Sequence, residues 1–434
     1  MNRNSWTFCD GNGRLDRAAP TITRRQAIVG AASLIAGGVW WAGAKSALAQ
    51  GAFRSDGGDG PVLVTIFLRG GADGLNIVAP YQEDDYYRHR PSLAIPAPRS
   101  GKPETKRLTD LDGFFGLNPA FLPLFPDFAE GNLAFVHAIG SGDTTHSHFE
   151  AMSTMELGLL NQSDRVSGGW LARHLNSTPE RQAPLRAVAF GGTMPDSLSG
   201  AHGAVAVNSL ADYRLSDVEP EWRQSLERLY SRGDTEIAEA GRDTLRVLRI
   251  LNSSDPRDYR PENGAKYPDS PLGKALKETA FLIKNGVGLE IACLDSTGWD
   301  SHITQGSVDG WLFELLSDLA RSIAAFRTDL GGEMRRVVVT VQTEFGRRVA
   351  ENSGLGTDHG AGGCMAVLGE AVSGGKIFGK WPGLVNDRLS GPGDLAVTTD
   401  YRSVFSEILQ GHLQNQNADV VFPGQSHKPL GILG

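Results

Sequence analysis

Residues 289–295 read LEIACLD and residues 335–343 read RRVVVTVQT, and between them Leu, Ile and Phe recur at helical spacing over 308–328. The two outer runs are apolar at most positions and rich in β-branched residues, which is typical of strands buried on both faces. A strand, a helix and a second strand in this order form a right-handed crossover, which makes the two strands parallel. These residues therefore predict an α/β fold built on a parallel sheet.

Similar apolar runs elsewhere in the chain extend this sheet. They are VLVTIFLR at 62–69, LAFVHAI at 133–139 and RAVAF at 186–190. A second helix is predicted from Ser270, a favourable N-cap, and Pro271, which suits the first helical position; Gly286 suits the position after the last turn. We expect one α/β domain over residues 50–434, in which the more polar residues 210–270 form a helical insertion.

The first 49 residues have the features of an export signal. Arg24 and Arg25 precede a weakly apolar segment rich in Gly and Ala, and the sequence ALA at 47–49 suits signal peptidase. Lys45, just before that site, disfavours the general secretory route. The alternatives are an amino-terminal membrane anchor or a chance arginine pair in a disordered tail. We expect transport by the twin-arginine translocase, a periplasmic or secreted mature protein, and no membrane span after cleavage.

The composition excludes several classes of protein. The 434 residues are 40% hydrophobic and 21% charged, values that support a packed core rather than a disordered chain. A net charge of −8 and the absence of a long Lys/Arg run argue against nucleic-acid binding. After signal cleavage only Cys293 and Cys364 remain, so we expect either one bridge between them or two buried thiols.

Polar loops with metal-binding side chains follow the predicted strands. These loops contain RGGADGLN (69–76), SGDTTHSHFEAM (141–152), STGWDSHITQ (296–305), EFGRR (344–348) and GLGTDHGAGG (354–363). In parallel sheets, ligands bind beyond the carboxyl ends of the strands. Carboxylate and imidazole together suit Zn, Mn or Fe, whereas Ca and Mg favour oxygen ligands alone. We expect a divalent metal at this edge, Zn or Mn, with Ca or Mg as the alternatives.

Each of these loops also has a purely structural interpretation. Asp73 among glycines is typical of a turn, and Ser147 and His148 suit the start of a helix. Glu344 and Arg347 are spaced for a simple ion pair. Because all these residues follow successive strands of one predicted sheet, they jointly favour a metal site over separate structural roles.

Five motifs in order, RGGADGLN, HSHFEAM, GWDSH, TEFGRR and GTDHG, resemble the exported family called domain of unknown function 1501. The resemblance spans about residues 60–434. The family is grouped with the alkaline phosphatase and sulfatase superfamily, which implies a three-layer α/β/α sandwich with a central, largely parallel sheet. The superfamily holds two metal ions by Asp and His at the carboxyl edge and places a Ser, Thr or formylglycine nucleophile at a helix start. The sulfatase signature C-x-P-x-R is absent here.

The resemblance implies roles for individual residues. The implied metal ligands are Asp73, Asp300, His302, Glu344, Asp358 and His359. The expected catalytic residues are Ser147 or Thr145 as the nucleophile, His148 or His146 as the proton carrier, and Arg347 as the cation that neutralises an ester oxygen. Two positions depart from the superfamily pattern: Asp73 lies four residues beyond Arg69, and Glu344 rather than Asp358 follows its strand directly.

These observations favour an exported, metal-dependent hydrolase of phosphate or sulfate esters, with a small molecule or a polymer as the substrate. One alternative is a non-catalytic binding protein that keeps the sheet and a metal but has no working nucleophile. Another is a structural subunit of an exported assembly, whose loops contact partners. Metal content separates the first two from the third, and turnover that depends on Ser147 or Thr145 separates the first from the second.

Overall fold

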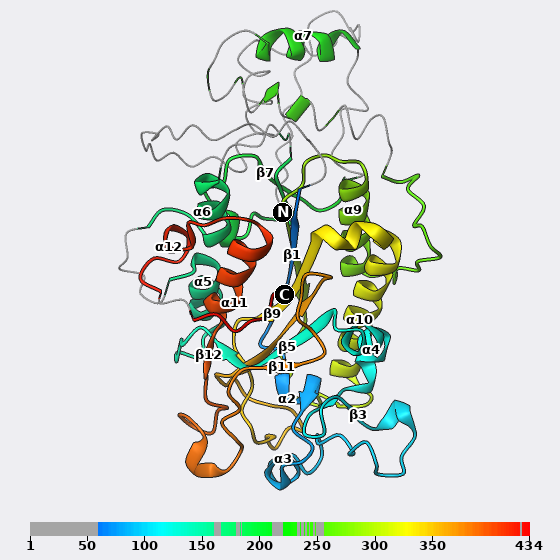
Figure 1. Ribbon diagram of the computed structural model, residues 1–434, viewed down its shortest axis with the longest axis vertical. Helices are drawn as coiled ribbons and strands as arrows, with labels where there is room; N and C mark the ends of the chain where they lie inside the picture. Colours follow the sequence, from blue (N-terminus) through cyan, green and yellow to red (C-terminus); the bar gives the residue numbers. More distant parts are fainter. Residues whose placement is uncertain are drawn as a thin grey trace, which may run out of the picture. The chain divides into compact units, whose positions relative to one another are not determined.

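The computed structural model has a large mixed sheet at its centre, with β1 among the inner strands (Figure 1). The strands follow the order β11-β5-β10-β9-β1-β8-β6-β7, and β12 also pairs with β5. They are β1 Val62–Arg69, β5 Leu133–Gly140, β6 Ala187–Phe190, β7 Ala204–Val207, β8 Ile291–Thr297, β9 Val337–Thr343, β10 Gly363–Leu368, β11 Ile377–Phe378 and β12 Thr399–Asp400. A small second sheet has the order β2-β4-β3, formed by Val78–Ala79, Gly116–Leu117 and Thr109–Asp110.

The structure describes residues 60–159, 166–178, 183, 185–210, 220–231, several positions between 235 and 248, 256–425 and 428–434. The predicted signal peptide, residues 1–49, lies outside the described residues, and so does part of the predicted insertion at 210–270. In the part of the chain that is described, no helix is both long enough and apolar enough to span a bilayer.

The direction of the strands brings four loops to one edge of the sheet. β1 is parallel to both β8 and β9. β10 is antiparallel to β9 and to β5, so β5 runs in the same direction as β9. The loops that follow β1, β5, β8 and β9 therefore all leave the carboxyl edge. β8 and β9 are parallel, as the crossover predicted, but β1 lies between them.

Helices cover both faces of the sheet, because alternate residues of its strands point into two separate cores. In β1, Val62, Val64 and Ile66 belong to one core, and Leu63 and Phe67 belong to the other. The first core contains α4 Phe125–Ala129, α9 Pro271–Lys284 and α10 Trp311–Leu330, and the second contains α5 His148–Leu157, α6 Trp170–Ser177, α11 Tyr401–Glu407 and α12 Ala418–Val421 (Figure 1). The predicted α/β/α sandwich with a largely parallel sheet is confirmed.

The remaining helices are short or peripheral. They are α2 Gly74–Ile77, α3 Asp84–His89 and α7 Pro220–Tyr230. α9 begins as the sequence predicts, since the Ser270 hydroxyl accepts a hydrogen bond from the Gly273 N–H at 3.0 Å. Asp329 of α10 is a buried carboxylate. It accepts hydrogen bonds from Tyr259 and Tyr267, which precede α9, and from Lys284 at the end of α9.

Both cysteines of the described chain are free and buried. Burial raises the pKa of the Cys293 thiol to about 12, and burial also raises that of Cys364. The second of the two sequence expectations, two buried thiols, therefore describes this structure. The thiols are inert, because a protonated and buried thiol is neither a nucleophile nor a metal ligand.

Candidate metal centre

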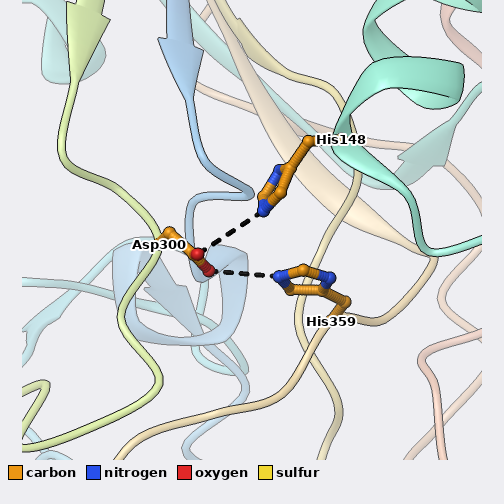
Figure 2. A group of neighbouring side chains, drawn as sticks. All are labelled: His148, Asp300 and His359. Atoms are coloured by element: carbon orange, nitrogen blue, oxygen red, sulfur yellow. Dashed lines mark hydrogen bonds and ion pairs between the residues drawn. The ribbon is translucent and has the colours of Figure 1, made fainter.

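Three side chains from three loops of the carboxyl edge converge on one point: His148, Asp300 and His359 (Figure 2). His148 is the first residue of α5, Asp300 follows β8, and His359 lies in the long loop between β9 and β10. One ligand atom from each lies within 4.8 Å of the others. The Asp300 carboxylate lies between the two rings, with Oδ2 3.5 Å from His148 Nε2 and Oδ1 3.1 Å from His359 Nε2.

His302 is a fourth member of this cluster. Its Nε2 lies 3.1 Å from Asp300 Oδ1 and 2.9 Å from His359 Nε2. His302 therefore adds a third imidazole nitrogen, which contacts two members of the group, Asp300 and His359. The four residues are separated by up to 211 positions in the sequence, and the sheet topology brings them together.

The other ring nitrogen of each histidine faces an acceptor. His148 Nδ1 lies 2.7 Å from Glu344 Oε1, His302 Nδ1 lies 3.2 Å from Asp358 Oδ1, and His359 Nδ1 lies 2.8 Å from the His146 carbonyl oxygen. Carboxylates and carbonyls only accept hydrogen bonds, so each Nδ1 is the protonated nitrogen and each Nε2 of a neutral ring has a free lone pair. Outer carboxylates and carbonyls orient metal-binding histidines in the same way.

The inner face of the cluster fits a divalent cation. His148 Nε2 is buried and has no hydrogen-bond partner among the described residues. The Nε2 atoms of His302 and His359 lie 2.9 Å apart, and a cation bound to both lone pairs would relieve their repulsion. Burial lowers the pKa of His359, which disfavours protonation of its ring. A protonated His359 is therefore an unfavourable source of positive charge at this contact. Three nitrogens and one carboxylate are donors for Zn or Mn rather than for Ca or Mg.

Asp300 is ionised under all ordinary conditions. Its partial burial raises its pKa, but the hydrogen bond from Arg347, the contact with His359 and the charge of Arg347 outweigh that effect and lower the pKa to about 2. The side chain remains 46% exposed, so the carboxylate faces both the cluster and solvent. A charged, partly open carboxylate is suited to hold a metal that a substrate can still reach.

Close backbone packing makes this geometry possible. Gly70 has φ +126°, and a Cβ on it would lie 2.5 Å from the Asp300 backbone nitrogen. The Gly70 N–H donates to Glu344 Oε1 at 2.8 Å, the same oxygen that holds His148. The buried Phe345 ring packs against His148 and His359, with centroid distances of 5.0 and 4.8 Å. These contacts fix the orientation of both imidazoles.

Arg347 joins the loops, and all three of its guanidinium nitrogens already donate to them. Its guanidinium donates to the carbonyls of Gly70, Gly71, Trp299 and Thr357, and to Asp300 Oδ1 at 2.7 Å. The residue is 1% exposed. From the sequence, Arg347 was expected to neutralise an ester oxygen. Its position gives it a different role, because it joins three loops and orients Asp300.

Asp73 lies apart from the cluster. Its carboxylate forms a bidentate ion pair with Arg90, at 2.6 Å to Nη1 and 3.0 Å to Nη2, and also accepts from Gln305 Nε2 at 2.6 Å. Asp73 and Arg90 are both almost completely buried. The ion pair uses both carboxylate oxygens, so Asp73 supports the loop after β1 rather than the common point of the histidines.

Glu344 and Asp358 lie behind the histidines rather than beside them. Glu344 holds His148 and is itself held by the Thr343 hydroxyl at 2.9 Å. Asp358 holds His302 and accepts from Asn352 Nδ2 at 3.0 Å, and this hydrogen bond is the main cause of its lowered pKa. Of the six residues expected as ligands, the structure brings Asp300, His302 and His359 to the common point.

The residues expected to carry out the chemistry lie at the start of α5. Ser147 is the N-cap residue, but its hydroxyl makes no capping hydrogen bond. Thr145 is exposed, and its hydroxyl donates to Asp143 Oδ1 at 2.7 Å. His148, expected to carry a proton, lies in the cluster instead. His146 has its Nε2 2.6 Å from Asp394 Oδ2, an acceptor that no sequence motif singled out.

Part of the chain matches the model of a known protein family. Residues 274–421 match the family described as "Protein of unknown function (DUF1501)", as the motifs predicted. Asp300, His302 and His359 all lie in that segment, whereas His148 precedes it. A comparison with curated proteins finds no relative that matches.

Several solved structures are similar to this chain at low identity. A sulfatase from Pseudoalteromonas sp., PsFucS1, has 10% identity and a TM-score of 0.37, over 86% of this chain and 73% of that chain. The phosphonate monoester hydrolase of Agrobacterium radiobacter has 11% identity and a TM-score of 0.33, over 85% and 78%. BT1596, a 2-O GAG sulfatase, has 8% identity and a TM-score of 0.32, over 72% and 65%.

Proposed function

We propose that this protein is a metal-dependent hydrolase of phosphate or sulfate esters. The observation that carries the proposal is the group of His148, Asp300 and His359, with His302 in contact with two of them. Ser147, the N-cap of α5, directly precedes His148 and makes no capping hydrogen bond. The arrangement combines donors for one divalent cation with a nucleophile at the start of a helix. Because Glu344 and Asp358 support histidines and Asp73 pairs with Arg90, the geometry favours one metal ion rather than two.

His148, His302, His359 and Asp300 would hold the metal, and Zn or Mn suits this donor set. When bound, such an ion acts as a Lewis acid toward an ester oxygen and lowers the pKa of a coordinated hydroxyl or water. Glu344, Asp358 and the His146 carbonyl keep the three imidazoles in the tautomer that binds metal.

In this proposal, Ser147 attacks the phosphorus or sulfur atom. The N–H groups in the first turn of α5 have no partner within the helix, and together with the helix dipole they favour the negative charge of the ester group. The Ser147 oxygen would form the new bond while the ester oxygen leaves with its organic group and takes up a proton. Water would then hydrolyse the covalent serine ester and release phosphate or sulfate. His146, oriented by Asp394, is the imidazole available to transfer protons.

Replacing Ser147 by alanine tests this assignment. We expect Ser147→Ala to lower the rate of ester hydrolysis more than about a hundredfold, because the nucleophile is lost. Metal content and thermal midpoint should stay near those of the wild type, since the hydroxyl makes no capping bond. Activity is measured on 4-nitrophenyl phosphate, bis(4-nitrophenyl) phosphate and 4-nitrophenyl sulfate with added Zn or Mn. Thr145→Ala is the matched control and should retain activity.

Each outcome separates one alternative. Unchanged activity in Ser147→Ala would point to direct attack by water, and loss of activity in Thr145→Ala alone would make Thr145 the nucleophile. A metal-loaded wild-type protein that is inert on every ester would contradict the hydrolase proposal and favour a binding protein. A wild-type protein without metal would favour a structural subunit.

We also propose that the protein acts outside the cytoplasm after twin-arginine export, which the Arg24-Arg25 pair and the ALA site at 47–49 support. Replacing both arginines by lysine should leave uncleaved precursor in the cytoplasm, as detected by fractionation and immunoblotting. A variant that changes Lys45 to Gln while keeping both arginines is the control for altered charge. Normal processing of the double-lysine variant would contradict the twin-arginine route.

A further inference from the structure

We propose that the ester substrate of this site carries an apolar organic group of several carbon atoms, an alkyl or aryl group, rather than a polyanionic polymer. This inference rests on the proposed function. The two most exposed large hydrophobic residues of the described chain are Phe149, at 84%, and Ile303, at 72%. Phe149 directly follows His148, and Ile303 directly follows His302. Both apolar side chains are thus attached to the backbone next to a proposed ligand.

A third exposed residue, Leu355, extends the apolar surface next to Ile303. Leu355 is 49% exposed. Its loop is joined to that of Ile303 by two backbone hydrogen bonds of 2.9 Å, from Thr304 N to Gly354 O and from Gln305 N to Leu355 O. A Cβ on Gly354 would lie 3.5 Å from Ile303 Cγ1, so the Ile303 side chain lies beside Gly354 of the Leu355 loop. Phe149, Ile303 and Leu355 are called the apolar rim.

The backbone at the rim is held in unfavourable conformations. Leu355 has φ +58° and Thr304 has φ +45°, in the left-handed region that bulky and β-branched residues avoid. His146, whose carbonyl holds His359, has φ +55°. Local backbone strain of this kind is tolerated where the surrounding structure enforces it, often at binding sites. Here the strained backbone presents a leucine to solvent, so core packing does not explain it.

The charges around the site favour an apolar ester over a polyanion. A polymer with many sulfate or phosphate groups needs several free basic side chains. Arg347 is buried and each of its guanidinium nitrogens donates within the protein, and Arg348 lies 3.7 Å from the Asp358 carboxylate. The partly exposed charged groups here are instead carboxylates, of Asp300 in the cluster and of Asp358 behind His302. A single anionic head group would lie at the metal, and hydrocarbon attached to it would cover the rim and be removed from water.

Ethyl and octyl monophosphate test the inference, because their leaving alcohols have nearly equal acidity and differ only in apolar length. We expect kcat/KM of the Zn-loaded or Mn-loaded wild type to be at least about tenfold higher for octyl phosphate, since several methylene groups would contact the rim. In the double variant Phe149→Ser/Ile303→Ser the octyl-to-ethyl ratio should fall about tenfold. The control, Leu229→Ser/Val420→Ser, removes exposed apolar residues of α7 and α12 and should keep the ratio.

Non-hydrolysable ethyl and octyl phosphonate distinguish failure of this inference from failure of the proposed function. Their affinities for the metal-loaded protein are measured by calorimetry, below the concentration at which octyl phosphonate forms micelles. Equal turnover of both esters, or a ratio that the rim variant does not change, would overturn the inference and leave the hydrolase standing. No turnover, with octyl phosphonate about tenfold tighter than ethyl phosphonate, would overturn the hydrolase and retain the apolar site. Equal phosphonate affinities would overturn the inference in either case.

Discussion

The His302→Ala protein is expected to lose its bound metal when purified without chelators. His302 supplies one of three imidazole nitrogens, and its Nε2 lies 3.1 Å from Asp300 Oδ1 and 2.9 Å from His359 Nε2. The remaining donors cannot replace a neutral imidazole, so affinity and hydrolysis should both fall by at least about a hundredfold. Elemental analysis and competition with a chromogenic chelator measure the loss. The thermal midpoint of the variant should also lie below that of the metal-loaded wild type, because metal binding to the folded state adds stability.

A second variant and a control make this result specific. Asp358→Asn keeps His302 but weakens the hydrogen bond behind it, so its metal affinity should fall about 10- to 100-fold, less than in His302→Ala. His202→Ala removes an exposed histidine that lies outside the cluster and should keep full occupancy. Full metal content in both His302→Ala and Asp358→Asn would show that these residues are structural and that the site lies elsewhere.

The Asp73→Ala protein should be severely destabilised while the part that folds still binds metal. Removing the carboxylate leaves the guanidinium of Arg90, which is 0% exposed, buried without its bidentate partner. Breaking a buried ion pair from one side costs about 3–5 kcal/mol of unfolding free energy. Gln305 also loses its acceptor. Denaturant unfolding measures the change, and elemental analysis of the folded fraction measures the metal.

The double variant Asp73→Ala/Arg90→Met is the control for this prediction. It removes both charges and should recover part of the lost stability, because no unpaired cation remains. If Asp73 were a metal ligand, as the superfamily resemblance implied, the Asp73→Ala protein would instead lose metal. Adding Arg90→Met would then not restore the metal content. A stable Asp73→Ala protein without metal would therefore contradict the role that the structure gives this residue.

The sheet could be predicted because strands buried on both faces leave a strong local signal. The run at 62–69 is β1 residue for residue, and the run at 335–343 differs from β9 by two residues at its start. Ser270 and Pro271 marked the start of α9 because capping depends on neighbouring residues only. The position of β1 between β8 and β9 could not be predicted from the sequence, because strand order depends on long-range pairing.

The site could be predicted only in part. The loops of Asp300, His302 and His359 were expected at one edge, since parallel strands have a common direction. The roles of neighbouring residues were less visible. A histidine that binds metal and one that carries a proton look alike in sequence. The place of His148 in the cluster became visible only in the structure, where it begins α5 and contacts Glu344.

The α/β class, the strands and the loops that carry histidine and carboxylate follow from local apolar patterning and from the direction of parallel strands, both of which can be predicted from the sequence. The atoms that meet in the site depend on how the chain folds. Asp73 pairs with Arg90, and Glu344 with His148, through contacts that depend on side-chain directions and close backbone approach at Gly70. A carboxylate that neutralises a buried arginine, one that orients an imidazole and one that faces a candidate metal site differ only in their neighbours, and folding determines those neighbours.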